Sequence, residues 1–248
     1  MNDTTAIVRR LVEAYRQRLR IEATPGQGPA DPDQAYAVQR LVWQAMAGDR
    51  PPVAWKVAAS SRDAEPIAAP VFPDRLADSP GCLARARFVG IGVEAEIALR
   101  FGQDLPPRPT PYSRAEILAA IGSAHVAMEL VDSRLADPEV AGPYWRLADN
   151  LLNGALILGD ALPHWRTQDW RDLTVRITAD DVVLSETVGR QPLEDLFHCL
   201  PWWLAHAGGA RKGDIVTTGA WSGMHPAGNA IALSATFNGL GKVEACIR

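Results

Sequence analysis

The spacing of hydrophobic positions changes along the chain, from a helical period near the start to alternation further on. Residues 4–20 carry apolar side chains at helical spacing with arginines on the other face, which predicts an amphipathic helix. A second helix is expected to begin with Asp31 as its N-cap and Pro32 in its first turn, and to run to about Ala47. The pattern therefore predicts an N-terminal helical region over residues 1–50.

Short apolar runs and alternation with a period of two predict strands over most of the remaining chain. The expected strands cover residues 53–59, 91–99, 124–132, 173–178, 182–187, 215–218, 230–237 and 242–247. Two more helices are predicted, one opened by a capping box at Ser113 and one over about 193–207. Residues 60–80 and 135–147 are expected to be irregular, and 150–159 form an apolar run with two embedded asparagines. Helices concentrated early and strands concentrated late favour an α+β fold.

Composition narrows the possible classes of protein. The chain has 248 residues, 47% hydrophobic and 22% charged, which suits one large domain or one domain with a small appendage. A formal net charge of −4 does not suggest nucleic acid or an anionic membrane as a partner. The three cysteines show no disulfide or zinc-site spacing, and the sequence shows neither a signal peptide nor a membrane-spanning run. We therefore expect a soluble cytoplasmic protein that forms one structural unit, with a β-rich catalytic region over residues 51–248.

Two glutamates on one predicted strand are the most informative feature of the chain. Glu94 and Glu96 alternate with the apolar residues Val93, Ala95 and Ile97, so both carboxylates project from one face of the strand. Like charges held this close disfavour ionisation of each other, and a bound divalent cation removes that repulsion. The alternative is a solvated strand face, which the tripeptide alone does not exclude.

A third carboxylate and a lysine lie in other apolar strands. Glu129 needs a partner or a cation, because burying an unpaired charge is costly; an ion pair with Arg134 or another basic residue is the alternative. Lys56 stands in the middle of an apolar strand, where burial would lower its pKa and make it usable for proton transfer. Its alternative is a packed stem with the ammonium reaching water or a surface carboxylate.

Four polar residues near predicted strand ends are candidates for substrate binding. Ser133, Arg134 and Asn150 flank the second irregular stretch, and Thr218 ends a strand in a run of small and hydroxyl-bearing residues. They could bind a substrate carboxylate or water. Each is equally explained as a turn or capping residue.

Taken together, these segments resemble the 2-keto-4-pentenoate hydratase branch of the fumarylacetoacetate hydrolase superfamily. The resemblance runs from about Asp31 to Ile247. Its carriers are Ala35-Tyr36-Ala37-Val38-Gln39, Trp55-Lys56-Val57, Val93-Glu94-Ala95-Glu96-Ile97-Ala98, Ala127-Met128-Glu129-Leu130-Val131-Asp132-Ser133-Arg134, Ala148-Asp149-Asn150, Leu158-Gly159, Lys212-Gly213-Asp214-Ile215-Val216-Thr217-Thr218-Gly219 and Phe237-Asn238-Gly239-Leu240-Gly241. The two glutamate-bearing blocks are the specific ones.

The resemblance implies a site, a fold and an activity. It implies that Glu94, Glu96 and Glu129 hold Mg²⁺ or Mn²⁺ and that Lys56 is the active-site lysine. It further implies a rolled mixed β-sheet, a homo-oligomer of two or more subunits, and a small 2-oxo acid or dienol as substrate. The expected reaction is addition of water to a 2-hydroxy-2,4-dienoate. Decarboxylation of a 4-oxalocrotonate-type acid and C–C hydrolysis of an acylpyruvate at the same site are the alternatives. A further alternative is a non-catalytic protein that binds a 2-oxo acid or serves as a partner subunit of another enzyme.

Two segments near the expected pocket depart from the family pattern, and one loop is a candidate lid. Ala58-Ala59-Ser60 stands where relatives have a glycine followed by Leu-Thr-Ser, and Leu151-Leu152-Asn153 stands where they carry small and serine residues. Residues 60–80 are the expected lid, in which Asp63 and Glu65 could position water. Solvated loop carboxylates are the alternative for these two.

Overall fold

The structure is a computed structural model that describes residues 3–189 and 193–248. Its helices are α1 (Thr4–Gln17), α2 (Pro32–Ala47), α3 (Arg114–Ala120), α4 (Pro138–Ala141), α5 (Pro143–Ala148) and α6 (Leu200–Ala207), with a short 3₁₀ turn η4 (Asn150–Leu152). Its strands are β1 (Ala54–Ala58), β2 (Ile67–Pro70), β3 (Leu76–Asp78), β4 (Gly81–Leu83), β5 (Gly92–Phe101), β6 (Ile121–Val131), β7 (Asn153–Ala161), β8 (Leu173–Ala179), β9 (Val182–Gly189), β10 (Ile215–Thr217), β11 (His225–Pro226), β12 (Ala232–Phe237) and β13 (Gly241–Ile247).

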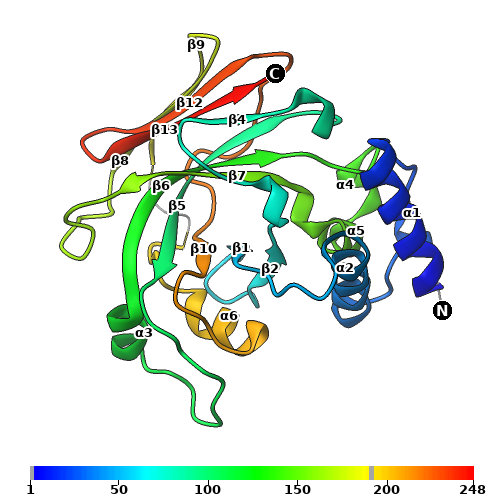
Figure 1. Ribbon diagram of the computed structural model, residues 1–248, viewed down its shortest axis with the longest axis horizontal. Helices are drawn as coiled ribbons and strands as arrows, with labels where there is room; N and C mark the ends of the chain where they lie inside the picture. The colour runs from blue at the N-terminus through cyan, green and yellow to red at the C-terminus, as the bar shows by residue number, and fades with distance from the viewer. Residues whose placement is uncertain (1–2, 190–192) are drawn as a thin grey trace.

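The strands form two sheets, and the larger one is strongly curved (Figure 1). The larger sheet has the order β2-β1-β10-β5-β6-β7-β3, with β11 paired to β5, and the smaller one has the order β4-β13-β12-β8-β9. Three pairings, β1 with β10, β3 with β7 and β4 with β13, are parallel, and the others are antiparallel. This curled mixed sheet, flanked by a few helices, confirms the predicted α+β fold.

The alternation along β5 and β6 divides the larger sheet into two unlike faces. One face carries Val93, Ala95, Ile97 and Met128 and packs into the main hydrophobic core, which the smaller sheet shares through residues such as Val175. The opposite face carries the glutamates together with small or aliphatic residues, among them Ala98 and Ala127. The second face has short side chains, so it leaves room for a buried polar site.

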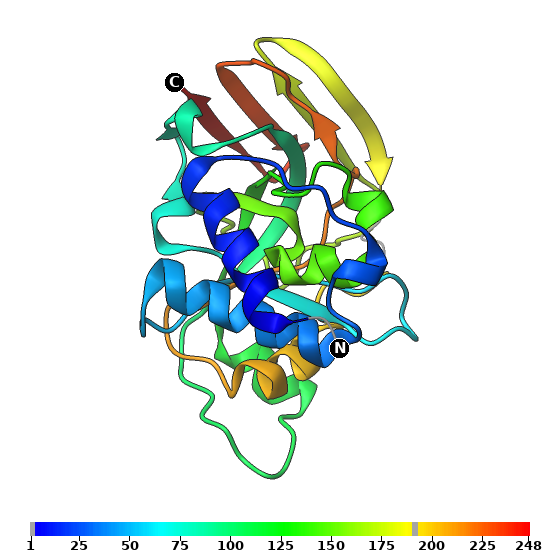
Figure 2. The same cartoon turned by 90° about the vertical axis from the view of Figure 1, so that its right-hand side faces the viewer.

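The N-terminal helices cover one end of the larger sheet (Figure 2). Leu11 of α1 and Val38 of α2 are fully buried in a second hydrophobic cluster with Phe72 and Trp145. Asp3 and Asp31 cap the two helices by accepting hydrogen bonds from the backbone N–H of Thr5 and Gln34. These helices therefore pack as part of the fold through an apolar face, as their hydrophobic spacing predicts.

Residues 60–80 are more ordered than the sequence suggests, and the prediction of one long irregular loop is wrong. Residues 67–70 form β2, which pairs with β1, and residues 76–78 form β3, which pairs with β7. Strands of three or four residues contain too few alternations to produce a recognisable period. The irregular connection that follows β1 is therefore limited to residues 59–66.

Three other stretches also differ from the prediction. The stretch 135–147, expected to be irregular, contains α4 and α5, which begin at Pro138 and Pro143 and are too short for a helical period to be seen. The helix predicted over 193–207 begins at Leu200, with Pro201 in its first turn, where a missing N–H costs nothing. The helix expected from Ser113 ends at Ala120, and β6 follows without a loop.

Gly159 allows the two sheets to approach each other, and its replacement by alanine tests this contact. A Cβ on Gly159 would lie 2.8 Å from the carbonyl oxygen of Lys242 in β13 and 2.9 Å from that of Val126 in β6. We expect Gly159→Ala to lower the free energy of unfolding by about 1–3 kcal/mol, the usual cost of overpacking. Gly26→Ala is the matched control, because a Cβ there would meet nothing within 4 Å. Urea unfolding of both variants provides the measurement, and equal stability would contradict the close contact.

Candidate metal centre

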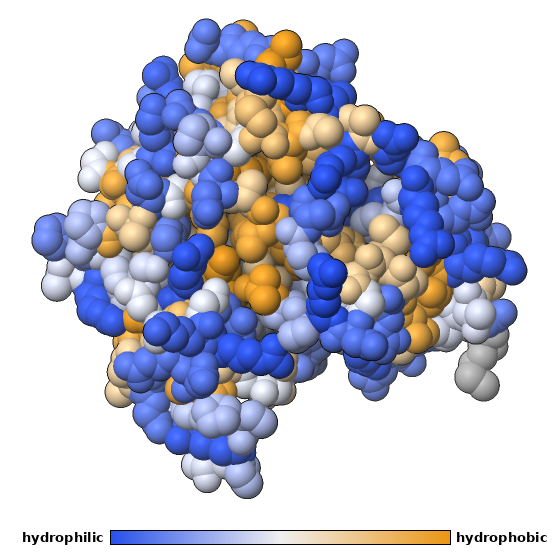
Figure 3. Space-filling view, viewed as in Figure 1, coloured by the Kyte–Doolittle hydropathy of each residue, from blue (hydrophilic) through white to orange (hydrophobic). Residues whose placement is uncertain are grey.

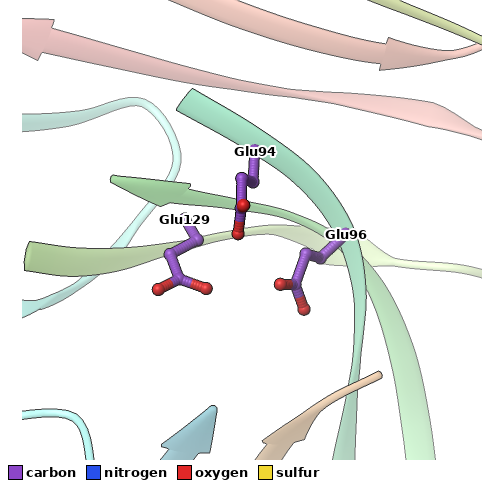
Figure 4. A group of neighbouring side chains, drawn as sticks. All are labelled: Glu94, Glu96 and Glu129. Carbon is purple, nitrogen blue, oxygen red and sulfur yellow. The ribbon is translucent and has the colours of Figure 1, made fainter. Parts of the chain in front are cut away.

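The three predicted carboxylates lie together on the inner face of the larger sheet. Glu94 and Glu129 are directly opposite each other in the antiparallel pairing of β5 and β6, and Glu96 follows two residues along β5 on the same face. One carboxylate oxygen from each of the three lies within 4.8 Å of the others. Figure 4 shows the side chains projecting from the two strands into the same space. Sheet register alone therefore assembles the cluster.

Burial leaves two oxygens of this cluster without a hydrogen-bond partner. Glu96 and Glu129 are fully buried, and the side chain of Glu94 is 15% exposed. Among the described residues, none donates a hydrogen bond to Glu96 Oε1 or Glu129 Oε2. Burial raises the pKa of Glu129 well above its ordinary value and also raises the pKa of Glu96. A bound cation would coordinate both oxygens and would offset the repulsion between the carboxylates.

Lys56 reaches the cluster from β1. Its Nζ lies 3.0 Å from Glu129 Oε1 and 3.3 Å from Glu94 Oε2. Lys56, rather than Arg134, is thus the basic partner of Glu129. The expected lowering of the Lys56 pKa is wrong for this arrangement: burial opposes the charged form, but the carboxylates of Glu129, Glu94 and Glu96 outweigh burial and raise the pKa.

The charge balance of the cluster fits a divalent ion. Three ionised carboxylates and one ammonium leave two negative charges uncompensated. The backbone N–H of Gly219 adds one hydrogen bond of 3.2 Å to Glu96 Oε2, which is a weak, neutral contribution. Buried carboxylates with free oxygens are the hard donors that Mg²⁺ and similar cations prefer. The residues present therefore fit a divalent cation held by Glu94, Glu96 and Glu129.

Arg134 lies in a buried ion pair, close to but separate from the carboxylate cluster. Its Nε donates to Asp149 Oδ1 at 2.6 Å, and its guanidinium lies over the ring of Tyr15. Burial raises the pKa of Asp149 to about 6, although the neighbouring Arg134 lowers it. Ser133 Oγ accepts a hydrogen bond from the backbone N–H of Leu135. The structure thus uses Arg134 and Ser133 to hold the chain between β6 and β7.

Asn150 and Thr218, also predicted to bind substrate, differ in their contacts. Asn150 is buried and donates from Nδ2 to the carbonyl oxygen of Pro70, while no described residue donates to its Oδ1. Thr218 Oγ1 donates to the carbonyl oxygen of Ile97 on β5. The arrangement leaves Asn150 Oδ1 as a buried acceptor for a donor group outside the described chain.

Asp63 and Glu65 lie in the exposed connection between β1 and β2. Glu65 Oε1 accepts a hydrogen bond of 3.2 Å from the indole N–H of Trp202 on α6. Lys56 is on β1, a few residues before this connection, which places the loop next to the strand that carries the lysine. The part these two carboxylates play stays a prediction.

A cavity of about 460 Å³ opens further along the larger sheet, and residues other than Lys56 and the three glutamates line it. Gly92 and Val131, which line it, are register partners two residues beyond Glu94 and Glu129 on the same face of the sheet. Leu152 and Met224 provide further apolar lining. In Figure 3, hydrophobic residues gather toward the middle of the face seen in Figure 1, inside a largely hydrophilic rim.

The sequence profile of the C-terminal domain of fumarylacetoacetate (FAA) hydrolases matches residues 47–248. The chain belongs to the fumarylacetoacetate hydrolase family. This confirms the predicted family, and the match extends over all four clustered residues, Lys56, Glu94, Glu96 and Glu129. The protein is an enzyme of this family.

Curated relatives of this fumarylacetoacetate hydrolase family member belong to the predicted branch. It is 28% identical over 234 residues to 2-keto-4-pentenoate hydratase 1 of Dechloromonas aromatica, covering 87% of this chain and 86% of that protein. It is 32% identical over 157 residues to 2-keto-4-pentenoate hydratase of Paraburkholderia phymatum, covering 62% of this chain and 59% of that one.

The fold of this family member is also that of a solved decarboxylase. The structure of 4-oxalocrotonate decarboxylase from Pseudomonas putida G7, complexed with magnesium and adipate, superposes with a TM-score of 0.81. The two chains are 21% identical, and the superposition covers 99% of this chain and 97% of the decarboxylase. Within the described ranges, no helix has the length and apolar character needed to cross a membrane.

Asn153 is a residue of the site that the sequence analysis missed. Its Nδ2 donates a hydrogen bond of 3.0 Å to Glu129 Oε1, and both side chains are buried. The available signal was an amide embedded in the apolar run 150–159, which needs a buried partner. The partner could not be identified, because strand pairing is not visible in a single sequence.

Removing Arg134 tests the importance of the buried ion pair. Arg134→Ala leaves the carboxylate of Asp149 buried without its cation, and we expect a loss of about 3–5 kcal/mol in the free energy of unfolding. Without Arg134, the pKa of Asp149 in the folded variant should rise further above its value in the unfolded chain. The free energy of unfolding then falls as the pH rises and the buried carboxyl group ionises, so the loss should be larger at high pH. Arg171→Ala, which breaks an exposed pair with Asp169, should change stability by about 0.5 kcal/mol or less. Urea unfolding at pH 6 and pH 8 provides the measurement, and a loss for Arg134→Ala that is the same at both pH values would contradict this role.

Proposed function

We propose that the protein is a metal-dependent hydro-lyase that adds water to a 2-hydroxy-2,4-dienoate and produces a 4-hydroxy-2-oxo acid. The observation that carries the proposal is the buried cluster of Glu94, Glu96 and Glu129 with Lys56 beside it. The curated relatives described above, which are named as 2-keto-4-pentenoate hydratases, support this reaction.

Mg²⁺ or Mn²⁺ is the cation we propose for the carboxylate cluster. The three carboxylates supply hard oxygen ligands from two strands. Two solved structures of 4-oxalocrotonate decarboxylase, which have this fold, are complexes with magnesium or calcium. When bound, the ion would act as a Lewis acid toward the carboxylate and 2-oxo oxygens of the substrate. The residues of the chain then have to orient the substrate and move its protons.

Lys56 is the proposed acid–base group. Its Nζ lies at the edge of the cluster, 3.0 and 3.3 Å from two of the carboxylates, so a 2-oxo acid held there would place its carbon chain beside the ammonium. The lysine would transfer a proton between the enol oxygen and the substrate carbon during conversion to the keto form. Ketonisation makes the far carbon of the dienoate electrophilic, and water adds to it.

Several other residues are proposed to shape the pocket. Asn150 would contact substrate through its open Oδ1, while Ser133, Arg134 and Thr218 would hold the surrounding chain through the contacts they already make. Asp63 and Glu65 would position the attacking water from the loop that follows β1.

The Asn150→Ala variant tests the proposed contact with substrate. If the variant folds and its KM is unchanged, Asn150 does not bind substrate.

We also propose that the protein assembles as a homo-oligomer. The motivating observation is the edge strand β9, whose Val182, Val183 and Val188 are exposed at 63%, 45% and 72%. Exposed apolar edge strands in monomers invite pairing with another chain. Sedimentation of a single monomeric species at micromolar concentration would contradict this assembly.

Decarboxylation of a 4-oxalocrotonate-type acid is the second candidate reaction. The observation that favours it is the near-complete structural match with 4-oxalocrotonate decarboxylase, at a TM-score of 0.81. The same cluster and lysine would serve either reaction, because both pass negative charge to the 2-oxo oxygen. The decision between the two lies in which bond of the substrate breaks.

An ultraviolet assay with purified protein separates the two reactions. A panel of 2-hydroxydienoates, 4-oxalocrotonates and acylpyruvates would be followed with Mg²⁺ and with EDTA. We expect loss of the dienol absorption band without release of CO₂, and no turnover in EDTA. Release of CO₂ from the dicarboxylate alone would select decarboxylation, and full activity in EDTA would contradict the metal-dependent mechanism.

Metal affinity should depend on Glu129 and on pH. Burial raises the pKa values of Glu129 and Glu96, so protons compete with a cation for these carboxylates more strongly as the pH falls. We expect Mn²⁺ binding, measured by calorimetry, to weaken as pH falls from 8 to 6. Glu129→Gln removes a proposed ligand, so its loss of Mn²⁺ affinity should exceed the about 10–100-fold that changes in supporting groups typically cause. Glu186→Gln, in an exposed pair with Arg176, is the control and should bind normally.

Lys56 should be required for turnover. Lys56→Met keeps the length of the side chain and removes the proton-transferring group, so we expect the rate of dienol consumption to fall about 10²–10⁴-fold. Lys242→Met, which removes an exposed ammonium paired with Glu244, is the matched control. A rate equal to that of the control would exclude Lys56 as the acid–base group.

A further inference from the structure

We propose that Asn153 is a positioning residue for Glu129, and that the strained turn and the bulge around it serve to place its amide group. The inference rests on the proposed metal site, because it assigns to Asn153 the orientation of one of its ligands. The starting observation is the hydrogen bond of 3.0 Å from Asn153 Nδ2 to Glu129 Oε1.

The turn that precedes Asn153 has an unusual backbone. Asn150, Leu151 and Leu152 have φ values of +55°, +53° and +61°, so three successive non-glycine residues are left-handed. For L-amino acids this conformation is unfavourable, because it brings Cβ too close to a neighbouring carbonyl oxygen. Such strain persists where surrounding contacts impose it, and it concentrates at functional sites.

Arg134 and the neighbouring backbone impose the strained turn. The guanidinium of Arg134 spans it, donating to the carbonyl oxygen of Asp149 at 2.9 Å and to that of Asn153 at 3.2 Å. The backbone N–H of Leu152 donates to the carbonyl oxygen of Asp149 at 3.0 Å. The backbone N–H of Asp132 donates to the carbonyl oxygen of Leu152 at 2.8 Å. Both ends of the turn are therefore fixed to residues that directly follow β6, the strand that carries Glu129.

A bulge then turns Asn153 to the face of the glutamates. The pairing of β6 with β7 slips by one residue, so that Leu130 pairs with Ala155 but Val131 pairs with Asn153. A slip of one residue moves a side chain to the other face of a sheet, here the face shared by Val131 and Glu129. The extra residue is Gly154, where a Cβ would lie 2.7 Å from the carbonyl oxygen of Leu130.

The amide of Asn153 determines which oxygen of Glu129 is left open. Oε1 accepts from Asn153 and also pairs with Lys56 at 3.0 Å, while Oε2 is buried and has no partner among the described residues. With Oε1 held from two sides, the carboxylate cannot rotate without breaking both contacts. Oε2 is thereby presented to the space between Glu129 and the two glutamates of β5. Outer-shell groups that orient a ligand in this way typically account for 10–100-fold in metal affinity.

Calorimetric titration with Mn²⁺ tests the assignment in the full-length protein. Asn153→Leu keeps the volume of the side chain and removes the donor, and Asn153→Ala provides a second, smaller variant. We expect either variant to bind Mn²⁺ about 10–100-fold more weakly than the unmodified protein. Asn238→Ala, an exposed asparagine between β12 and β13, is the matched control and should bind normally.

Thermal unfolding without metal separates positioning from general damage. A purely structural role would lower the melting temperature of the metal-free variants and leave the Mn²⁺ affinity of the folded fraction unchanged, which would overturn the inference. An affinity within twofold of the unmodified protein in either folded variant would do the same. If the unmodified protein does not bind Mn²⁺, the proposed metal site itself fails. If the unmodified protein binds Mn²⁺ and Glu129→Gln does not, the metal site stands. In that case, normal Mn²⁺ affinity in an Asn153 variant contradicts only the positioning role of Asn153.

Discussion

The electrostatic cost of burying three carboxylates on one face of a sheet governs this structure. Glu96 and Glu129 are fully buried and Glu94 nearly so, which would be unfavourable without compensation. The surrounding chain supplies one ammonium from Lys56, one backbone N–H from Gly219 and one amide from Asn153. These groups come from three different strands or strand ends, so compensation of the charge and assembly of the sheet are the same event.

The two faces of β5 and β6 have different roles: one packs into the hydrophobic core and the other carries the glutamates. On the outer face, Val93, Ile97 and Met128 pack into the large apolar core with the second sheet. On the inner face, Ala98 and Ala127 occupy the positions beside the glutamates and leave space that larger side chains would fill. Strict alternation along two long strands therefore places a rigid core directly behind a polar site. A ligand sphere supported in this way needs little reorganisation when a cation binds.

The sequence predicts the parts of this site that depend on short-range periodicity. Alternation in β5 is enough to place Glu94 and Glu96 on one face, and the family resemblance correctly brings in Glu129 and Lys56 as neighbours. What the sequence could not show is the effect of neighbours on charge: burial alone predicts a lowered pKa for Lys56, yet the carboxylates raise it.

Features that depend on register or on very short elements also escape the sequence. Strands β2 and β3 and helices α4 and α5 are too short to show a period, so the stretches that contain them looked irregular. The contact from Asn153 to Glu129 requires a bulge at Gly154, and a bulge leaves no periodic signature in one sequence. Such sites become visible only when strand partners are known.

The position of β10 has a consequence for the order in which the site is completed. Residues 215–217 lie between β1 and β5, so the strand that bears Lys56 joins the strand that bears Glu94 and Glu96 through a segment far along the chain. The glutamate hairpin is local, whereas the lysine is connected to it by contacts of long sequence separation, which form slowly. The strand that bears Lys56 therefore has no connection through the sheet to the glutamate strands until residues 215–217 are in place.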